Sequence, residues 1–146
     1  MQGGIGLIVR DFTGNCIGVQ GAYFDGGMTK GIEVELECEA MLAAVTYAVV
    51  KGFSKVVFES DSQVLIKSIN EQNYYVHWMN CSIVLDIKFL LSKLAQWNCV
   101  SVKRSANGVA DKLAKKARIL RSNFEFQSAL PLEIQEWVDE DNNVIS

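Results

Sequence analysis

The stretch ECEAMLAAVTYAVVKGFSKVVFESDS, residues 37–62, decides the fold. Alanine, leucine and methionine recur at helical spacing in its first half, which predicts a helix over residues 35–51 that ends at the glycine after it. Residues 55–59 are a short apolar strand, and Asp61 or one of the serines beside it can cap a helix over residues 63–70. Helix, strand and helix in succession indicate an α/β unit with parallel strand pairing.

Glycine-rich sequence precedes this unit and predicts a β-hairpin. Nine of the 11 glycines fall within the first 31 residues. Two β-rich runs, residues 6–10 and 16–23, flank the polar, glycine-ended linker of residues 11–14. Such a linker between two strand-like runs is typical of a hairpin.

Helix and strand patterns alternate again after the unit. An apolar stripe predicts a packed helix over residues 79–95, and residues 99–103 alternate as a strand. Asn107 then caps a last helix whose inward face consists of alanine and leucine. The expected fold is α/β, with an N-terminal β-hairpin followed by elements in the order α-β-α-α-β-α.

The composition is that of a folded domain. Hydrophobic residues make up 49% of the 146 residues and charged residues 21%, which argues against disorder. The uncharged helical run 40–50 is too short to span a bilayer and no secretory leader is expected, so no membrane partner is predicted. The four cysteines form no CxxC pair, which favours free thiols in a reducing compartment, the cytoplasm or the nucleus.

Charge is distributed unevenly along the chain. The net charge of −3 excludes a wholly basic nucleic-acid coat, yet residues 103–121 hold seven basic residues against one acid. Residues 122–146 hold six acids and no base. The basic stretch is either an anion-binding surface or a solvated helix face beside an acidic tail. We expect a single domain over residues 1–121, with residues 122–146 as its acidic C-terminal segment.

Three carboxylates stand out by their positions. Taken singly, Glu39 near a helix start, Asp61 at a possible helix cap and Asp111 four residues before Lys115 all have simple structural explanations. Taken together, they suggest one site: Asp61 lies at the carboxyl end of a strand, where sites gather in open α/β sheets, and Glu39 and Asp111 lie near the N-termini of helices that flank strands. Converging acids repel one another unless a divalent cation holds them, and oxygen-only ligands favour Mg²⁺ or Mn²⁺. Such a cluster is typical of nucleases that hydrolyse phosphodiesters.

Residues 3–18, 37–62 and 102–117 resemble the ribonuclease H-like superfamily, and specifically the plant-type, retroelement-related ribonuclease H domain, in family order and spacing. The resemblance implies Mg²⁺- or Mn²⁺-dependent endonucleolytic cleavage of the RNA strand in RNA–DNA hybrids. It places the family's catalytic and metal-binding acids on the same three residues, Glu39, Asp61 and Asp111.

Basic residues beside these acids are predicted to bind the nucleic acid. Lys103, Arg104 and Lys112 lie close to the carboxylates in sequence, where they would contact phosphates. The resemblance adds Asn107 as a further contact to the hybrid. The implied partner is an RNA–DNA hybrid or another nucleic acid.

Two departures from the family put its activity in doubt for this chain. The family's first strand is central in a sheet ordered 3-2-1-4-5 and carries an aspartate that bridges both metal ions, and this chain is expected to lack that strand. The hairpin then either re-pairs or hangs loosely. Ser101 also stands where the family often has a histidine, and His77, the only histidine, lies elsewhere.

Activity is therefore expected to be weak or absent, and two alternatives to a hybrid ribonuclease stay open. One is a non-catalytic nucleic-acid-binding module. The other is an interaction scaffold, in which residues 133–141, with Trp137 and Val138, dock onto a partner or complete the sheet. A strand-completing partner or a homodimer is compatible with the exposed seam that a missing strand would leave.

Overall fold

The computed structural model describes residues 3–24, 30–60, 62–71, 81–101, 109–120, 124–126 and 130–145. Five strands and five helices are found within these ranges. They run in the order β1 Gly3–Asp11, β2 Cys16–Phe24, α1 Lys30–Val50, β3 Lys55–Ser60, α2 Gln63–Asn70, α3 Cys81–Leu91, β4 Gln96–Ser101, α4 Val109–Leu120, β5 Phe124–Phe126 and α5 Leu132–Ile145.

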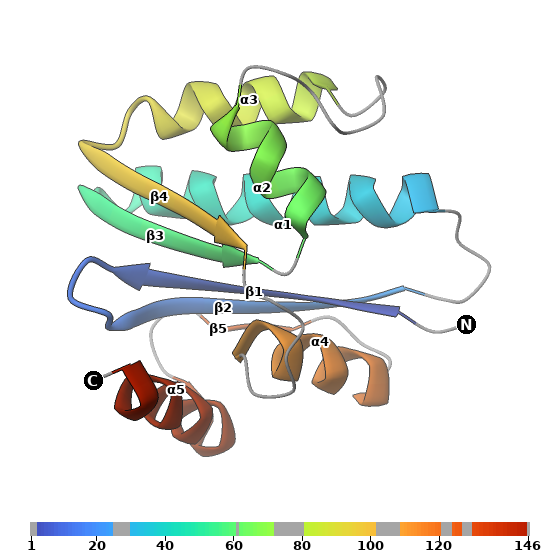
Figure 1. The fold of residues 1–146 in the computed structure, drawn as a ribbon, viewed down its shortest axis with the longest axis vertical. Helices are drawn as coiled ribbons and strands as arrows, with labels where there is room; N and C mark the ends of the chain where they lie inside the picture. The colour runs from blue at the N-terminus through green and yellow to red at the C-terminus, as the bar shows by residue number, and fades with distance from the viewer. Residues whose placement is uncertain are drawn as a thin grey trace.

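The strands form one mixed sheet in the order β4-β3-β1-β2-β5. Strands β3 and β4 run parallel, and the other neighbours are antiparallel. Helices α1, α2 and α3 cover one face of the sheet, and α4 and α5 lie on the other (Figure 1). The predicted α/β class, the hairpin and the parallel pairing are confirmed.

The hairpin re-pairs directly with the parallel half of the sheet. Strand β1 runs antiparallel to β3, with partners from Leu7↔Ser60 to Asp11↔Val56. Across this seam Arg10 Nε donates to Glu59 Oε2 at 2.8 Å, and both side chains are largely buried. Of the two alternatives, re-pairing is therefore the one found.

Alternation along β1 divides the core into two clusters. Leu7 and Val9 pack with α1, α2 and α3, whereas Ile8 packs on the opposite face with α4 and α5. Because successive strand side chains point to opposite faces, one strand supplies both cores. This double burial explains why the consecutive residues Leu7, Ile8 and Val9 are all apolar.

Local signals in the sequence account for the element ends. Gly14 (φ 93°) lies in the hairpin turn and Gly52 (φ 77°) ends α1, both in the left-handed region that glycine adopts without strain. In the turn, burial acts to raise the pKa of Asp11, but the hydrogen bonds from Thr13 and Asn15 together outweigh it and hold that pKa below its ordinary value.

Several boundaries differ from those predicted. Helix α1 begins at Lys30 rather than residue 35, and β4 spans Gln96–Ser101 rather than 99–103. Helix α3, predicted over 79–95, spans Cys81–Leu91 within the described residues. A search of the described helices for a segment that could span a bilayer finds no candidate.

The predicted elements end before residue 122, and the structure adds a strand and a helix beyond that point. Strand β5 pairs with β2 and extends the sheet. Helix α5 starts after Pro131 and buries Ile134 and Val138 in the cluster formed with α4. The signals were a proline before a helix start and apolar residues at helical spacing, Ile134, Trp137 and Val138.

The Cys99 thiol is expected to be nearly inert in the folded protein. Burial raises its pKa from the ordinary value of 9.0 to about 12, so at pH 8 roughly one molecule in 10⁴ carries the thiolate. Because the folded state holds this proton more tightly, the site's contribution to stability is complete below pH 9.0 and is lost as the pH rises through about 12. Iodoacetamide labelling followed by peptide mass spectrometry should modify the half-buried Cys16 faster than the buried Cys99. Equal rates for Cys99 in native protein and in urea would contradict the expectation.

Candidate functional site

The candidate site lies where β3 and β4 end side by side. Their last residues, Ser60 and Ser101, are partners in the parallel register. Helix α2 begins just after β3, and Figure 1 shows α4 on the opposite face of the sheet. Sites in open α/β sheets form at such carboxyl ends, as the sequence predicted.

Ser60 and Ser62, the residues on either side of position 61 in the chain, are joined by a hydrogen bond. The Ser62 N–H donates to Ser60 Oγ at 3.2 Å, and Ser62 Oγ accepts from the Leu65 N–H at 3.3 Å. Both serine side chains are buried. Capping of α2 therefore falls to Ser62. Asp61 itself lies outside the described residues.

Glu39 is an exposed acid on α1. Glu37, on the same helix, is buried at 6% exposure. Sequence reasoning did not single out Glu37, because acid spacing along a helix does not reveal which acid faces the core. Of these two acids, Glu39 is the one open to a solvent-borne ligand.

Of the three acids predicted to share a metal ion, only Glu39 has a side chain within the described residues. Asp111 belongs to α4, but its side chain falls outside what is described. A search of the described side chains for three or more His, Cys, Asp or Glu residues that could share an ion finds none. Among the predicted nucleic-acid contacts, Lys103, Arg104 and Asn107 also lie outside the described residues.

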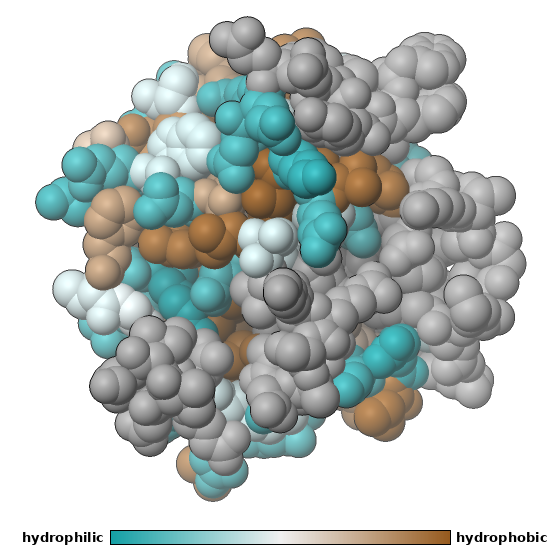
Figure 2. Space-filling view, viewed as in Figure 1, coloured by the Kyte–Doolittle hydropathy of each residue, from teal (hydrophilic) through white to brown (hydrophobic). Residues whose placement is uncertain are grey.

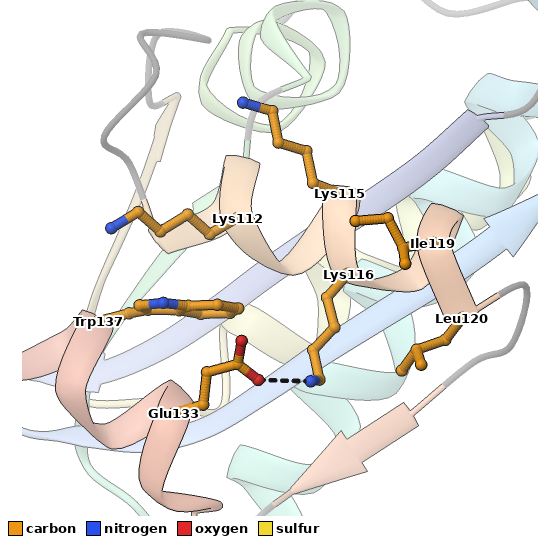
Figure 3. A pocket seen from close by; sticks show the side chains of 7 residues that line it. All are labelled: Lys112, Lys115, Lys116, Ile119, Leu120, Glu133 and Trp137. Carbon is orange, nitrogen blue, oxygen red and sulfur yellow. Dashed lines mark hydrogen bonds and ion pairs between the residues drawn. The ribbon is translucent and has the colours of Figure 1, made fainter.

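Lys112 is described, and it lines a groove between α4 and α5 (Figure 3). Its Nζ lies 5.9 Å from the centroid of the Trp137 ring. The groove has a volume of about 410 Å³. Its lining residues are Lys112, Lys115, Lys116, Ile119, Leu120, Glu133 and Trp137.

Sequence reasoning had not joined these residues into one site. Lys116 Nζ contacts Glu133 Oε2 at 2.7 Å across the groove. Lysines at positions 112, 115 and 116 were a visible signal, because residues three and four apart share a helix face. The spacing of the lysines did not indicate that Trp137, 25 positions after Lys112, packs against the same face of the helix.

The outer surface of the β3–β4 half is partly apolar. Val100 on edge strand β4 is 41% exposed. Figure 2 shows brown, hydrophobic residues at the level of β3 and β4 with hydrophilic residues around them. Asn70 Nδ2 donates to the Cys99 carbonyl at 2.9 Å and ties α2 to β4.

Comparisons with known proteins agree with this arrangement. A family model described as "Reverse transcriptase-like" matches residues 1–117. The crystal structure of RNase H1 from the halophilic archaeon Halobacterium salinarum NRC-1 superposes with a TM-score of 0.59, at 23% sequence identity. The match covers 78% of this chain and 83% of that one, and the likeness is one of fold. No curated protein matches the chain.

Proposed function

The chain belongs to the reverse transcriptase-like family and has a ribonuclease H-like fold, and from that premise we propose that it binds RNA–DNA hybrids but hydrolyses them weakly or not at all. The proposal keeps the nucleic-acid-binding part of the resemblance and treats the chemistry as impaired. It also includes the plant-type and retroelement-related origin that the sequence resemblance implies.

Direct pairing of β1 with β3 is the observation that carries the proposal. In the resembled family, the strand with the bridging aspartate lies between the equivalents of these two strands. Here Ile8 is the direct partner of Glu59, and Val9 is the partner of Phe58. Adjacent strands lie about 4.8 Å apart, so this sheet leaves no space for a strand between them. A metal pair bridged from that position is therefore not supported.

Glu39, Asp61 and Asp111 are the proposed metal ligands. Ribonuclease H-like proteins generally use divalent metal ions. Carboxylate oxygens are the donors that Mg²⁺ and Mn²⁺ prefer, so the chemistry of the three side chains fits such an ion. A bound ion would supply charge neutralisation at the scissile phosphate. With only three carboxylates, affinity for the ion is expected to be low.

Lys103, Arg104, Lys112 and Asn107 are the proposed contacts to the hybrid. Of these, only Lys112 lies within the described residues, one residue beyond Asp111 on α4. Phosphate contacts of this kind give an affinity that falls as the salt concentration rises, whatever the base sequence.

The second candidate, an interaction scaffold built on residues 133–141, is less well supported because Val138 is buried within its own chain.

The expected result is salt-sensitive hybrid binding without efficient cleavage. Fluorescence anisotropy with a labelled RNA–DNA hybrid should show a double variant, K103A/R104A, binding about tenfold more weakly, with a salt slope smaller by roughly 2. The matched control Lys51→Ala removes an exposed lysine beyond the end of α1 and should change neither value. Hydrolysis in Mg²⁺ or Mn²⁺ should be at least about 10³-fold slower than that of a catalytically complete ribonuclease H1 measured alongside.

Two outcomes would contradict the proposal. Hybrid affinity that does not respond to salt would remove the binding function. Robust hydrolysis that Asp61→Asn abolishes would show an intact catalytic site.

Thermal unfolding with and without Mn²⁺ tests the metal ligands separately from activity. Any stabilisation by the ion should disappear in Asp61→Asn.

A further inference from the structure

We infer that the outer face of α3 is a self-association surface, on which two copies of the chain pair their α3 helices antiparallel to form a dimer. The inference goes beyond the proposed function and does not depend on hybrid binding. It also differs from a dimer that completes the sheet, because β1 and β3 already close the seam.

Two large apolar side chains lie exposed side by side on this face. Leu85 is 53% exposed and Phe89 is 63% exposed, and residues four apart share one face of a helix. The opposite side of α3 is packed, since Val84, Ile87 and Leu91 are buried in the core. Helix α3 packs on α1 and α2 at the outside of the molecule (Figure 1). An apolar stripe in such a position favours burial against a partner.

Opposite charges stand at the two ends of the stripe. Asp86 and Lys93 are both exposed, and within the described part of the chain neither takes part in an ion pair. Lys93 Nζ lies 4.8 Å from the centroid of the Phe89 ring, which puts this lysine on the face of the stripe. Lys88, in contrast, is bound to its own chain, since its Nζ donates to the Glu71 carbonyl at 2.9 Å.

The order of these charges fits a second copy in the antiparallel orientation. The Lys93 N–H donates to the Leu90 carbonyl at 3.0 Å, so the helical turn continues to this residue. Asp86 and Lys93 are seven residues apart, about 10 Å along the helix, with Phe89 between them. A two-fold axis through the middle of that span brings each Asp86 opposite the partner's Lys93 and brings the two Phe89 rings together. A parallel pair would place like charges opposite each other, which is unfavourable.

The small size of the contact sets the expected strength. One helix pair buries less surface than the roughly 1,200–2,000 Å² of a stable complex, so we expect a weak dimer with a Kd on the order of 10 µM. Helix α3 and strand β4 are joined by a short turn and run in opposite directions, so the start of α3 lies toward the carboxyl end of β4 (Figure 1). An antiparallel pair therefore holds the two candidate sites toward opposite ends of the dimer and leaves both open.

The first test is the mass of the full chain measured by sedimentation equilibrium. Wild type should change from monomer to dimer between about 1 and 200 µM. Phe89→Ala should weaken association at least about tenfold, because it removes the central contact. Leu132→Ala is the matched control, since Leu132 is 75% exposed on α5, and it should associate like wild type. A wild-type chain that stays monomeric over the whole range would overturn the inference, and so would loss of association in Leu132→Ala.

An exchange of charges tests the antiparallel register. Asp86→Lys alone should weaken association about tenfold, because it places two lysines opposite each other at both ends of the contact. Combining Asp86→Lys with Lys93→Asp makes the opposing charges complementary again and should restore most of the affinity. A double variant that associates as weakly as Asp86→Lys would show that the helices do not pair in this way.

Two further readouts separate the dimer from folding and from the proposed function. Because the substituted side chains are exposed, all the variants should unfold at the same temperature as wild type. Phe89→Ala should bind a short, blunt RNA–DNA hybrid like wild type. Monomeric wild type that binds the hybrid would overturn only the dimer, and a dimer that binds no hybrid would overturn only the proposed function.

Discussion

Glu59→Gln is expected to lower the free energy of unfolding by about 3 kcal/mol, although the side chain keeps its size. Glu59 and Arg10 join β1 to β3, and their side chains are 17% and 6% exposed. The substitution leaves the Arg10 guanidinium buried beside a neutral amide, and removing one member of a buried ion pair is strongly destabilising. Thermal unfolding should show a midpoint lowered by roughly 6–12 °C.

Glu133→Gln is the matched control for that experiment. It makes the same chemical change in a pair of nearly equal length, since Lys116 and Glu133 are 2.7 Å apart and Arg10 and Glu59 are 2.8 Å apart. Glu133, however, is 56% exposed, and exposed pairs contribute about 0–1 kcal/mol. If Glu59→Gln and Glu133→Gln lowered the free energy of unfolding equally, burial would not be the reason why the Arg10–Glu59 pair contributes to stability.

A double variant separates the pair from the isolated charge. Arg10→Met combined with Glu59→Leu removes both charges and keeps the volume apolar. Replacing a buried ion pair in this way is often neutral, so most of the stability lost in Glu59→Gln should return. A double variant as unstable as Glu59→Gln would indicate instead that the pair itself holds the seam together.

Ile134→Ala is expected to destabilise the whole protein by about 3 kcal/mol. Ile134 lies on α5 and is fully buried in the cluster that includes Ile8 of β1 and Leu113 of α4. Truncating it removes apolar contacts and leaves a cavity that the surrounding side chains fill only in part. Urea denaturation followed by circular dichroism should show a single transition at a lower midpoint.

The same measurement tests whether residues 122–146 fold together with residues 1–121, as proposed from the sequence. Leu132→Ala is the control, because Leu132 belongs to the same helix but is 75% exposed, and its loss should change stability by less than about 0.5 kcal/mol. A separate low-stability transition in Ile134→Ala, with the main transition unmoved, would show that α5 unfolds independently of the rest.

Much of the fold was predictable because its signals are local. The helix, strand and helix of residues 37–62 follow from helical periodicity, a glycine stop and a serine cap, each of which acts within about four residues. The Gly52 stop and the Ser62 cap are both present in the structure. The three acids could be singled out for the same reason, since a carboxylate beside a strand end or helix start is visible in the chain.

Features that join distant segments were not predictable in this way. From the sequence, the hairpin could either pair with the parallel half of the sheet or remain loose. Its pairing with β3 depends on contacts such as the one between Arg10 and Glu59, which are 49 residues apart. Helix α5 was missed because its apolar residues become a signal only when a surface accepts them, and α4 and β1 supply that surface.

The linear chain therefore determined the α/β class, the family and the candidate acids, because periodicity, caps and motif order depend only on residues that are close together in sequence. Only the tertiary structure closed the sheet at the β1–β3 seam and placed Trp137 beside Lys112. Both outcomes depend on burying apolar faces that come from segments far apart in sequence. The hydrophobic effect that drives this burial has no preferred direction and depends on the whole core. No local sequence pattern therefore specifies which strand or helix an apolar face will pack against.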